Sequence, residues 1–186
     1  IKKQMNMKKT ILTFACAAIF CACSANSKSD KDNVAAPMET TATEASQSVA
    51  DDSELAPDFT LNDINGKPLT LSSLRGKYVV LDFWGSWCVW CIKGMPEMKN
   101  YYKKYAGKFE ILGIDCNESE AKWKAAVKEL ELPWKHVYNP KSSDLLGKYG
   151  IQGFPTKIVI DPQGKIVKTV IGEDPAFYTY LDELFK

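Results

Sequence analysis

The sequence has almost no net charge and almost no histidine. Its 24 Lys and Arg side chains are balanced by 23 Asp and Glu side chains over 186 residues. Proteins that bind nucleic acids need a basic surface, so nucleic acid is excluded as a partner. The single histidine, His136, gives little support for Ser-His or Cys-His hydrolase chemistry, which needs a positioned imidazole. We interpret His136 as a surface or loop residue.

The sequence also lacks an apolar run long enough to span a bilayer, which takes about 20 residues in a helix. Residues 11–20 are nearly all apolar and follow the basic stretch Met7-Lys8-Lys9, an arrangement typical of a signal peptide. Ala22-Cys23 comes next, resembles a bacterial lipobox and predicts acylation of Cys23. The alternative is ordinary signal cleavage near Ala25, which gives a soluble secreted protein. Either outcome places the mature chain outside the cytoplasm, where disulfides persist.

Composition divides the chain into three parts. Residues 1–23 are the predicted lipoprotein signal peptide, which ends at the lipidated Cys23. Half of residues 24–53 are Ser, Thr or Ala, none is aromatic and their net charge is −4, so they cannot bury enough apolar surface to fold. We predict a disordered tether with a reach of roughly 30 Å. Residues 54–186 have the composition of a folded domain that is large enough to be stable without a disulfide.

The apolar pattern of residues 54–186 predicts an α/β domain. Residues 78–84 and 109–115 are nearly continuous apolar runs, typical of strands buried on both faces of a sheet. The predicted order is a hairpin over 59–71, strand 78–84, helix 91–105, strand 109–115, helix 119–130, a short strand at 137–138, a short helix over 144–149, a hairpin over 156–171 and a helix over 177–185. This order indicates a central mixed β-sheet with helices on both faces and an N-terminal β-hairpin extension.

Two of the six cysteines, Cys88 and Cys91, follow a predicted strand at the start of a predicted helix and are separated by two residues. A thiolate at a helix N-terminus is stabilised by free backbone N–H groups and by the helix dipole, which lowers its pKa. At this spacing the two sulfurs can close a small disulfide ring. One sulfur can attack a foreign disulfide, and the other can then release the mixed disulfide.

Cys-x-x-Cys also occurs in zinc sites and at sites of haem attachment. Haem attachment needs a histidine directly after the second cysteine, where this chain has Ile92. A closed zinc site needs four ligands, and the other Cys and His residues of the folded domain are Cys116 and His136, which are not spaced as a ligand pair. We therefore predict no metal and no other cofactor. We interpret Cys116 as a buried structural cysteine, with a regulatory or glutathionylated thiol as the alternative.

Two separated groups of residues resemble the thioredoxin superfamily. They are Asp82-Phe83-Trp84 with Trp87-Cys88 and Cys91, and Gly150-Ile151 with Phe154-Pro155-Thr156. Three further segments are similar to the extracytoplasmic thiol–disulfide oxidoreductases of the TlpA/ResA type: Ala56-Pro57-Asp58-Phe59, Leu74-Arg75-Gly76-Lys77 and Val79-Val80-Leu81. The resemblance covers residues 54–186 and implies a thioredoxin-like fold.

The resemblance also assigns catalytic roles. It implies that Cys88 is the exposed nucleophile and Cys91 the buried resolving thiol. Asp82 would be a buried acid that exchanges a proton with Cys91, because a carboxyl within an apolar strand should be desolvated and have a raised pKa. The alternative is an Asp82 side chain that reaches solvent at the end of the strand.

A second set of residues is expected to bind substrate. Pro155 matches the family's cis-proline, which faces the dithiol and presents backbone groups to an extended substrate strand. A plain turn at Phe154-Pro155 is the alternative. Trp87, Trp90 and Phe154 are predicted to contact the substrate, with packing of Trp90 on its own helix as the alternative for that residue.

Three departures limit the resemblance. Val89-Trp90 stands between the cysteines where thioredoxins usually have Gly-Pro, a dipeptide that tunes the reduction potential. Gly94 stands where ResA-like proteins carry an acidic residue, and Ile111 stands where thioredoxins carry the lysine that pairs with the buried acid. Proton handling is therefore expected to fall to Asp82 alone.

The resemblance implies a thiol–disulfide oxidoreductase that reduces client proteins with disulfides. Together with the predicted acylation of Cys23, it places the protein in the periplasm on a lipid anchor, and we expect a monomer. A membrane thiol transporter would act as its electron donor. Two other classes compete with this interpretation. Peroxiredoxins hold their cysteine in a Pro-x-x-x-Thr-x-x-Cys pattern, where this chain has Leu81 and Gly85. Copper chaperones need Cys-x-x-x-Cys, which is one residue longer than the spacing found here.

Overall fold

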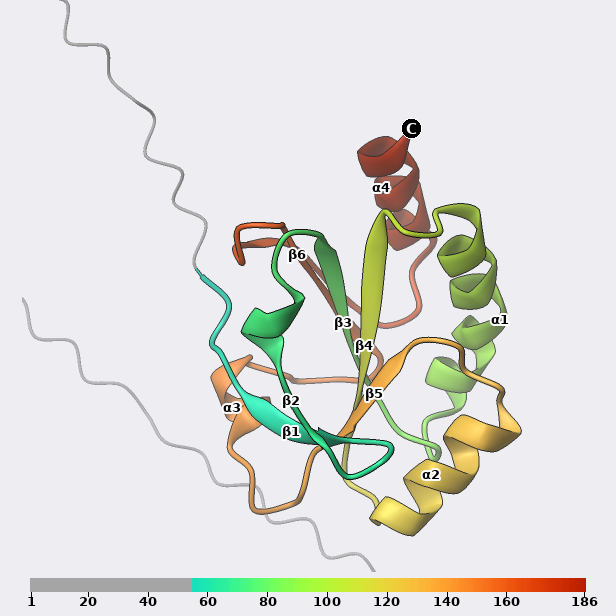
Figure 1. Cartoon of the computed structure of the whole chain (residues 1–186). Coiled ribbons are helices and arrows are strands. Elements are labelled where there is room, and N and C mark those ends of the chain that lie inside the picture. The colour runs from blue at the N-terminus through green and yellow to red at the C-terminus, as the bar shows by residue number, and fades with distance from the viewer. Residues whose placement is uncertain (1–54) are drawn as a thin grey trace, which may run out of the picture. The chain divides into compact units, whose positions relative to one another are not determined.

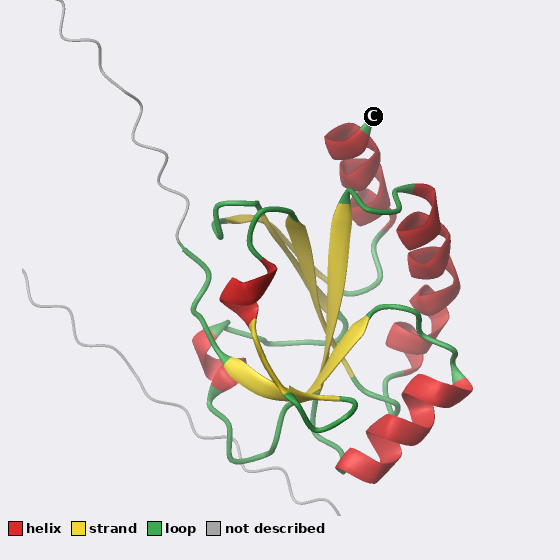
Figure 2. Cartoon of the chain, in the orientation of Figure 1, coloured by secondary structure: helices red, strands yellow, loops and turns green. Residues whose placement is uncertain are grey.

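The computed structural model describes residues 55–186, in which seven strands form one sheet with helices on both sides (Figure 1, Figure 2). The strands are β1 (Thr60–Asp63), β2 (Pro68–Thr70), β3 (Tyr78–Trp84), β4 (Phe109–Asp115), β5 (Lys135–Tyr138), β6 (Thr156–Ile160) and β7 (Ile166–Ile171). The helices are α1 (Val89–Lys104), α2 (Glu120–Glu129), α3 (Leu145–Lys148), α4 (Pro175–Phe185) and the 3₁₀ helix η1 (Leu71–Leu74). The predicted signal peptide, Cys23 and the tether over residues 24–53 lie outside the described residues.

The sheet is mixed, with the strand order β2-β1-β5-β4-β3-β6-β7. Strands β3, β4 and β5 run parallel, whereas β6 and β7 are antiparallel to their neighbours. The hairpin of β1 and β2 joins the sheet through antiparallel pairing of β1 with β5. Helices α1, α2 and α4 pack on one face, and η1 and α3 pack on the other (Figure 1). The predicted mixed sheet, with helices on both faces and an N-terminal hairpin, is therefore confirmed.

Strand β3 shows how its sequence serves both faces. Val80 and Trp84 pack in the core beneath α1, α2 and α4, whereas Leu81 and Phe83 pack in the core on the other face. All four side chains are fully buried, and each such burial stabilises the fold by roughly 1.5–3 kcal/mol. Asp82 lies between Leu81 and Phe83, so its side chain points to the same face as Val80 and Trp84.

Helix α1 begins at Val89, two residues before the predicted start. Cys88 is its N-cap residue and has an extended backbone conformation. Met95 and Met98 turn toward the sheet, and Lys103 and Lys104 complement the helix dipole in the last turn. The helix thus starts directly after the carboxyl end of β3.

The first described residues pair at the opposite end of β3. Leu55 forms an isolated bridge with Lys165, and the Ala56 N–H donates to the Gly164 carbonyl at 2.9 Å. These partners lie in the turn between β6 and β7, just beyond Ile160, which is paired with the start of β3. Within residues 55–186, no helix has the length and apolar character needed to cross a membrane.

Candidate active site

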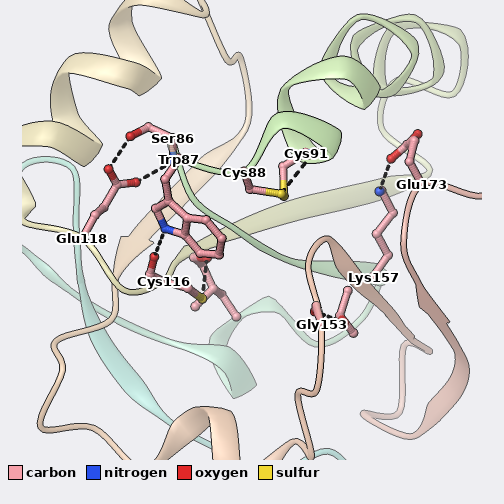
Figure 3. The surroundings of a disulfide bond; sticks show 11 residues. Ser86, Trp87, Cys88, Cys91, Cys116, Glu118, Gly153, Lys157 and Glu173 are labelled. Carbon is pink, nitrogen blue, oxygen red and sulfur yellow. Dashed lines mark hydrogen bonds and ion pairs between the residues drawn. A yellow bond between two sulfur atoms is a disulfide. The ribbon is translucent and has the colours of Figure 1, made fainter. Parts of the chain in front are cut away.

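The two cysteines of the Cys-x-x-Cys motif form a disulfide at the N-terminus of α1 (Figure 3). The Sγ atoms of Cys88 and Cys91 are 2.07 Å apart, and the Cys91 N–H donates to the Cys88 Sγ at 3.1 Å. The prediction of an exposed Cys88 is wrong for this disulfide form, because Cys88 is 6% exposed and Cys91 3%. Cys88 is buried because its sulfur is bonded to Cys91 and accepts a hydrogen bond within the first turn of the helix.

Exposed apolar side chains surround this disulfide. Trp87, Val89 and Trp90 are 49%, 62% and 61% exposed, respectively. The Trp87 ring meets the Phe154 ring edge-on at 5.2 Å between centroids, and its Nε1 donates to the Cys116 carbonyl at 2.8 Å. Trp90 does contact its own helix, through the Lys93 Nζ at 4.5 Å from the ring centroid, yet most of its surface remains open. Three of the residues predicted to bind substrate therefore lie beside the disulfide or its loop.

The loop before β6 carries the predicted cis-proline. The Phe154–Pro155 peptide bond is cis. The Pro155 carbonyl accepts a hydrogen bond from the Gly172 N–H at 2.7 Å, and the Thr156 hydroxyl donates to the Gly153 carbonyl at 2.7 Å. These two bonds fix the loop to β7 and to the start of β6.

Asp82 is buried on the face of the sheet that carries α1, with 2% of its surface exposed. This burial excludes the alternative in which its side chain reaches solvent. Burial raises the pKa of Asp82 to about 6, while Lys157 acts to lower it and Glu173 to raise it. The Asp82 Oδ1 has no hydrogen-bond partner among the described residues. A carboxyl with this pKa can accept and return a proton near neutral pH.

Sequence reasoning missed the two charged side chains next to Asp82. Lys157 on β6 is the cross-strand partner of Asp82, and its Nζ lies 2.7 Å from the Glu173 Oε2 (Figure 3). Asp82 is therefore not alone in this part of the core, contrary to expectation. The available signal was a lysine within the apolar run of β6. Glu173 follows β7 in a short loop, and nothing in its local sequence marks it.

The position of Gly94 explains how Glu173 enters this region. A β-carbon at residue 94 would collide with the Glu173 carboxylate. Gly94 thus has no side chain at the position where ResA-like proteins carry an acidic residue, and the Glu173 carboxylate occupies the space beside it. The Tyr178 hydroxyl donates to the Glu173 Oε1 at 2.6 Å and holds that carboxylate in place.

A further acidic side chain positions the loop before the disulfide. Glu118 accepts a hydrogen bond from the Ser86 N–H at 2.7 Å and another from the Ser86 hydroxyl (Figure 3). Nearby, burial and Glu118 raise the pKa of Asp115 to about 8. Cys116 is fully buried, and burial raises the pKa of its thiol. These properties match the interpretation of Cys116 as a structural cysteine, because a reactive thiol needs access and a low pKa.

The interpretation of His136 as a surface or loop residue is wrong. His136 lies on β5, is 4% exposed and packs against the rings of Trp84 and Trp134. The centroid of each tryptophan ring lies 5.9 Å from the centroid of the imidazole ring. Gly113, its neighbour on β4, leaves the space that the imidazole occupies. Burial lowers the pKa of His136 to about 3, so the ring is neutral at physiological pH. Residues 55–186 contain no cluster of three or more His, Cys, Asp or Glu side chains able to hold a metal ion.

Proteins of known sequence and structure are similar to this chain. The AhpC/TSA family model matches residues 53–169. The thiol-disulfide oxidoreductase ResA of Bacillus cereus is 41% identical over 119 residues, which cover 63% of this chain and 68% of that relative. The thioredoxin domain of a thiol-disulfide oxidoreductase from Bacteroides vulgatus gives a TM-score of 0.67 at 33% identity, covering 72% of this chain and 97% of that one. The exposed lipoprotein thioredoxin of Streptococcus pneumoniae gives 0.60 at 33% identity, covering 68% and 99%. The predicted thioredoxin-like fold is confirmed.

Proposed function

Because the chain belongs to the AhpC/TSA family and is a thiol–disulfide oxidoreductase similar to ResA, we propose that it reduces disulfide bonds of client proteins outside the cytoplasm. The observation that carries this proposal is the Cys88–Cys91 disulfide at the N-terminus of α1, on the face of the sheet where Asp82 is buried. The helix terminus stabilises a Cys88 thiolate, and the buried carboxyl supplies a base for the second cysteine.

The reaction starts from the reduced pair. The Cys88 thiolate attacks one sulfur of the client disulfide and forms a mixed disulfide with it. The other client sulfur leaves as a thiolate and takes a proton from solvent. Cys88 is suited to this attack because it is the helix N-cap, where free backbone N–H groups stabilise negative charge.

The second step releases the client. The Cys91 thiol gives its proton to the Asp82 carboxylate, and the Cys91 sulfur attacks the Cys88 sulfur. The mixed disulfide breaks, the Cys88–Cys91 disulfide forms, and the second client sulfur leaves and is protonated. Two electrons have passed from the enzyme dithiol to the client, and an external dithiol must then reduce Cys88–Cys91 for another cycle.

The client would bind to the apolar rim around the disulfide. Trp87, Trp90 and Phe154 offer aromatic surface, and Pro155 lies in a loop that is held to the strands on both sides. Exposed aromatic side chains next to a reacting bond suit an extended peptide segment, because they bury apolar area without needing a particular client sequence.

The proposed cellular setting rests on the signals predicted in the N-terminal sequence. In this proposal residues 1–23 direct export, Cys23 carries the lipid anchor and residues 24–53 tether the catalytic domain of residues 54–186 as a monomer. A membrane thiol transporter supplies the electrons. The exposed lipoprotein thioredoxin of Streptococcus pneumoniae supports this arrangement, since its name describes a related domain held by a lipid.

A Cys91→Ala variant tests the proposal in the native host. Without the resolving thiol, mixed disulfides between Cys88 and client proteins should accumulate and appear as higher bands on non-reducing gels. The Cys88→Ser/Cys91→Ala double variant is the matched control and should capture nothing. If the single variant captures no client, the proposed function is wrong. A reduction potential of about −120 mV, the value of a strong oxidant, would contradict the reducing direction.

A further inference from the structure

Lys157 and Glu173 form a buried ion pair next to the active-site carboxyl. Lys157 is paired with Asp82 across β3 and β6, so both side chains point to the face that carries α1 and α4. The Lys157 and Glu173 side chains are 3% and 17% exposed, respectively, with 2.7 Å between Nζ and Oε2 (Figure 3). Bringing two charges into the core carries a large desolvation penalty, so such a pair contributes little to stability.

The space for the Glu173 carboxylate lies about one helical turn after Cys91 on α1. Gly94 is three residues after Cys91 on α1, and the Glu173 carboxylate fills the space that a side chain at position 94 would need. One Glu173 oxygen is bound by Lys157, and the other accepts from the Tyr178 hydroxyl at 2.6 Å. The carboxylate is therefore fixed in position rather than free to turn toward solvent.

We propose that Lys157 and Glu173 are positioning residues that balance Asp82 between its carboxylate and its carboxylic acid form while Cys91 resolves the mixed disulfide. This inference rests on the proposed reductase function and deepens it. Lys157 favours the Asp82 carboxylate, whereas Glu173 neutralises the charge of Lys157. With both present, Asp82 can take the Cys91 proton in resolution and return it when Cys91 is reduced again.

The other titratable groups around Asp82 are poor candidates for this role. Cys91 of α1 does not titrate while it is in the disulfide, and burial raises the pKa of both Tyr178 of α4 and Cys116 after β4. Tyr178 and Cys116 therefore stay neutral near pH 7. Lys157 of β6 and Glu173 of the loop before α4 are the charges that act on Asp82.

The two partners of the pair should shift the titration of Asp82 in opposite directions. Glu173→Gln leaves the Lys157 charge uncompensated, so the pKa of Asp82 should fall. Lys157→Met leaves the Glu173 carboxylate next to Asp82, so the pKa should rise. Each shift should be about one pH unit or more, because a single neighbouring charge typically shifts the pKa of a carboxyl by 1–3 units. The double variant should lie between the two single variants.

The experiment follows the ¹³C signal of the Asp82 carboxyl by NMR in the disulfide form, assigned by its loss in Asp82→Asn. In wild type its midpoint should lie at about 6. Lys124→Met and Glu120→Gln, which break an exposed pair on α2, are the matched controls and should leave the midpoint unchanged. The pH profile of mixed-disulfide resolution should shift in the same direction as the NMR titration.

Opposite shifts of the two single variants support the inference, and equal or absent shifts overturn it. Removing one partner of a buried pair leaves an uncompensated charge in the core, so Lys157→Met is the variant at risk of not folding. Glu173→Gln keeps the shape of the side chain, and without a fall in the Asp82 midpoint the inference is wrong. If the Cys91→Ala variant captures no client protein and wild type reduces none, the proposed function fails instead, whatever the titrations show.

Discussion

An Asp82→Asn substitution should stabilise the disulfide form of the protein at neutral pH and slow resolution. The folded protein holds the pKa of Asp82 at about 6, against 3.8 for the free side chain. This rise means that the carboxylate is disfavoured in the core relative to the unfolded chain. The cost is fully present above pH 6 and disappears as the pH falls through 6 toward 3.8.

The size of the effect follows from the shift in pKa. A rise from 3.8 to about 6 corresponds to about 3 kcal/mol in full, of which about 2 kcal/mol develops between about pH 4.5 and pH 8. Asn has the shape of Asp but does not ionise, so it carries no pH-dependent cost of burying a charge. The difference in unfolding free energy between Asp82→Asn and wild type should therefore grow by about 2 kcal/mol over this range.

Urea unfolding of both proteins as disulfides, at a series of pH values, measures this difference. Using the difference between variants cancels the other groups that titrate, including the buried His136. The control is Asp144→Asn, because Asp144 is an exposed partner of Lys148 on α3 and should show no such growth. A stability difference that stays flat from pH 4.5 to pH 8 would refute the argument that burial controls Asp82.

The same variant should also slow catalysis. Resolution of a mixed disulfide between Cys88 and a coloured aromatic thiol can be followed by release of the thiolate. Without the base, the rate at pH 7 should fall by about 10²-fold or more, and the dependence on Asp82 ionisation should disappear. If Asp82→Asn resolves at the wild-type rate with an unchanged pH profile, Asp82 has no part in the proton transfer.

Three further predictions concern the surroundings of the disulfide. Gly94→Ala should destabilise the protein by about 1–3 kcal/mol in urea unfolding, because its β-carbon meets the Glu173 carboxylate, whereas Gly147→Ala meets open space and should not destabilise it. Cys116 should resist alkylation at pH 8 in the folded disulfide form and react only after unfolding; rapid labelling of the native protein would restore the regulatory interpretation. Trp90→Ala should lower kcat/KM for a protein disulfide by about tenfold but not for a small one, and an equal loss on both would place Trp90 outside the client surface.

The parts of the fold that depend on residues adjacent in the sequence could be predicted from it. The continuous apolar runs of β3 and β4 identify strands buried on both faces, and the turn residues identify the two hairpins. Cys88 and Cys91 were identified by spacing and by their place before a helix. In each case the signal lies within a few consecutive residues.

The errors and omissions involve partners that are distant in the sequence. His136 was interpreted as a surface residue because the space left by Gly113 belongs to another strand. Glu173 was not identified because its contacts with Lys157 and Gly94 form only when the loop before α4 packs against α1. Local sequence contains no information on which side chain fills a gap left by a distant glycine.

The bridge between Leu55 and Lys165 places the start of the domain at the end opposite the active site. Leu55 is fixed at the turn between β6 and β7, whereas the Cys88–Cys91 disulfide follows the far end of β3. At the usual rise of a strand, the seven residues of β3 separate these two ends by about 20 Å. The described chain therefore begins at the end of β3 opposite the disulfide. If the domain is tethered through its N-terminal side as we propose, its reactive bond faces away from the point of attachment and remains accessible to client proteins.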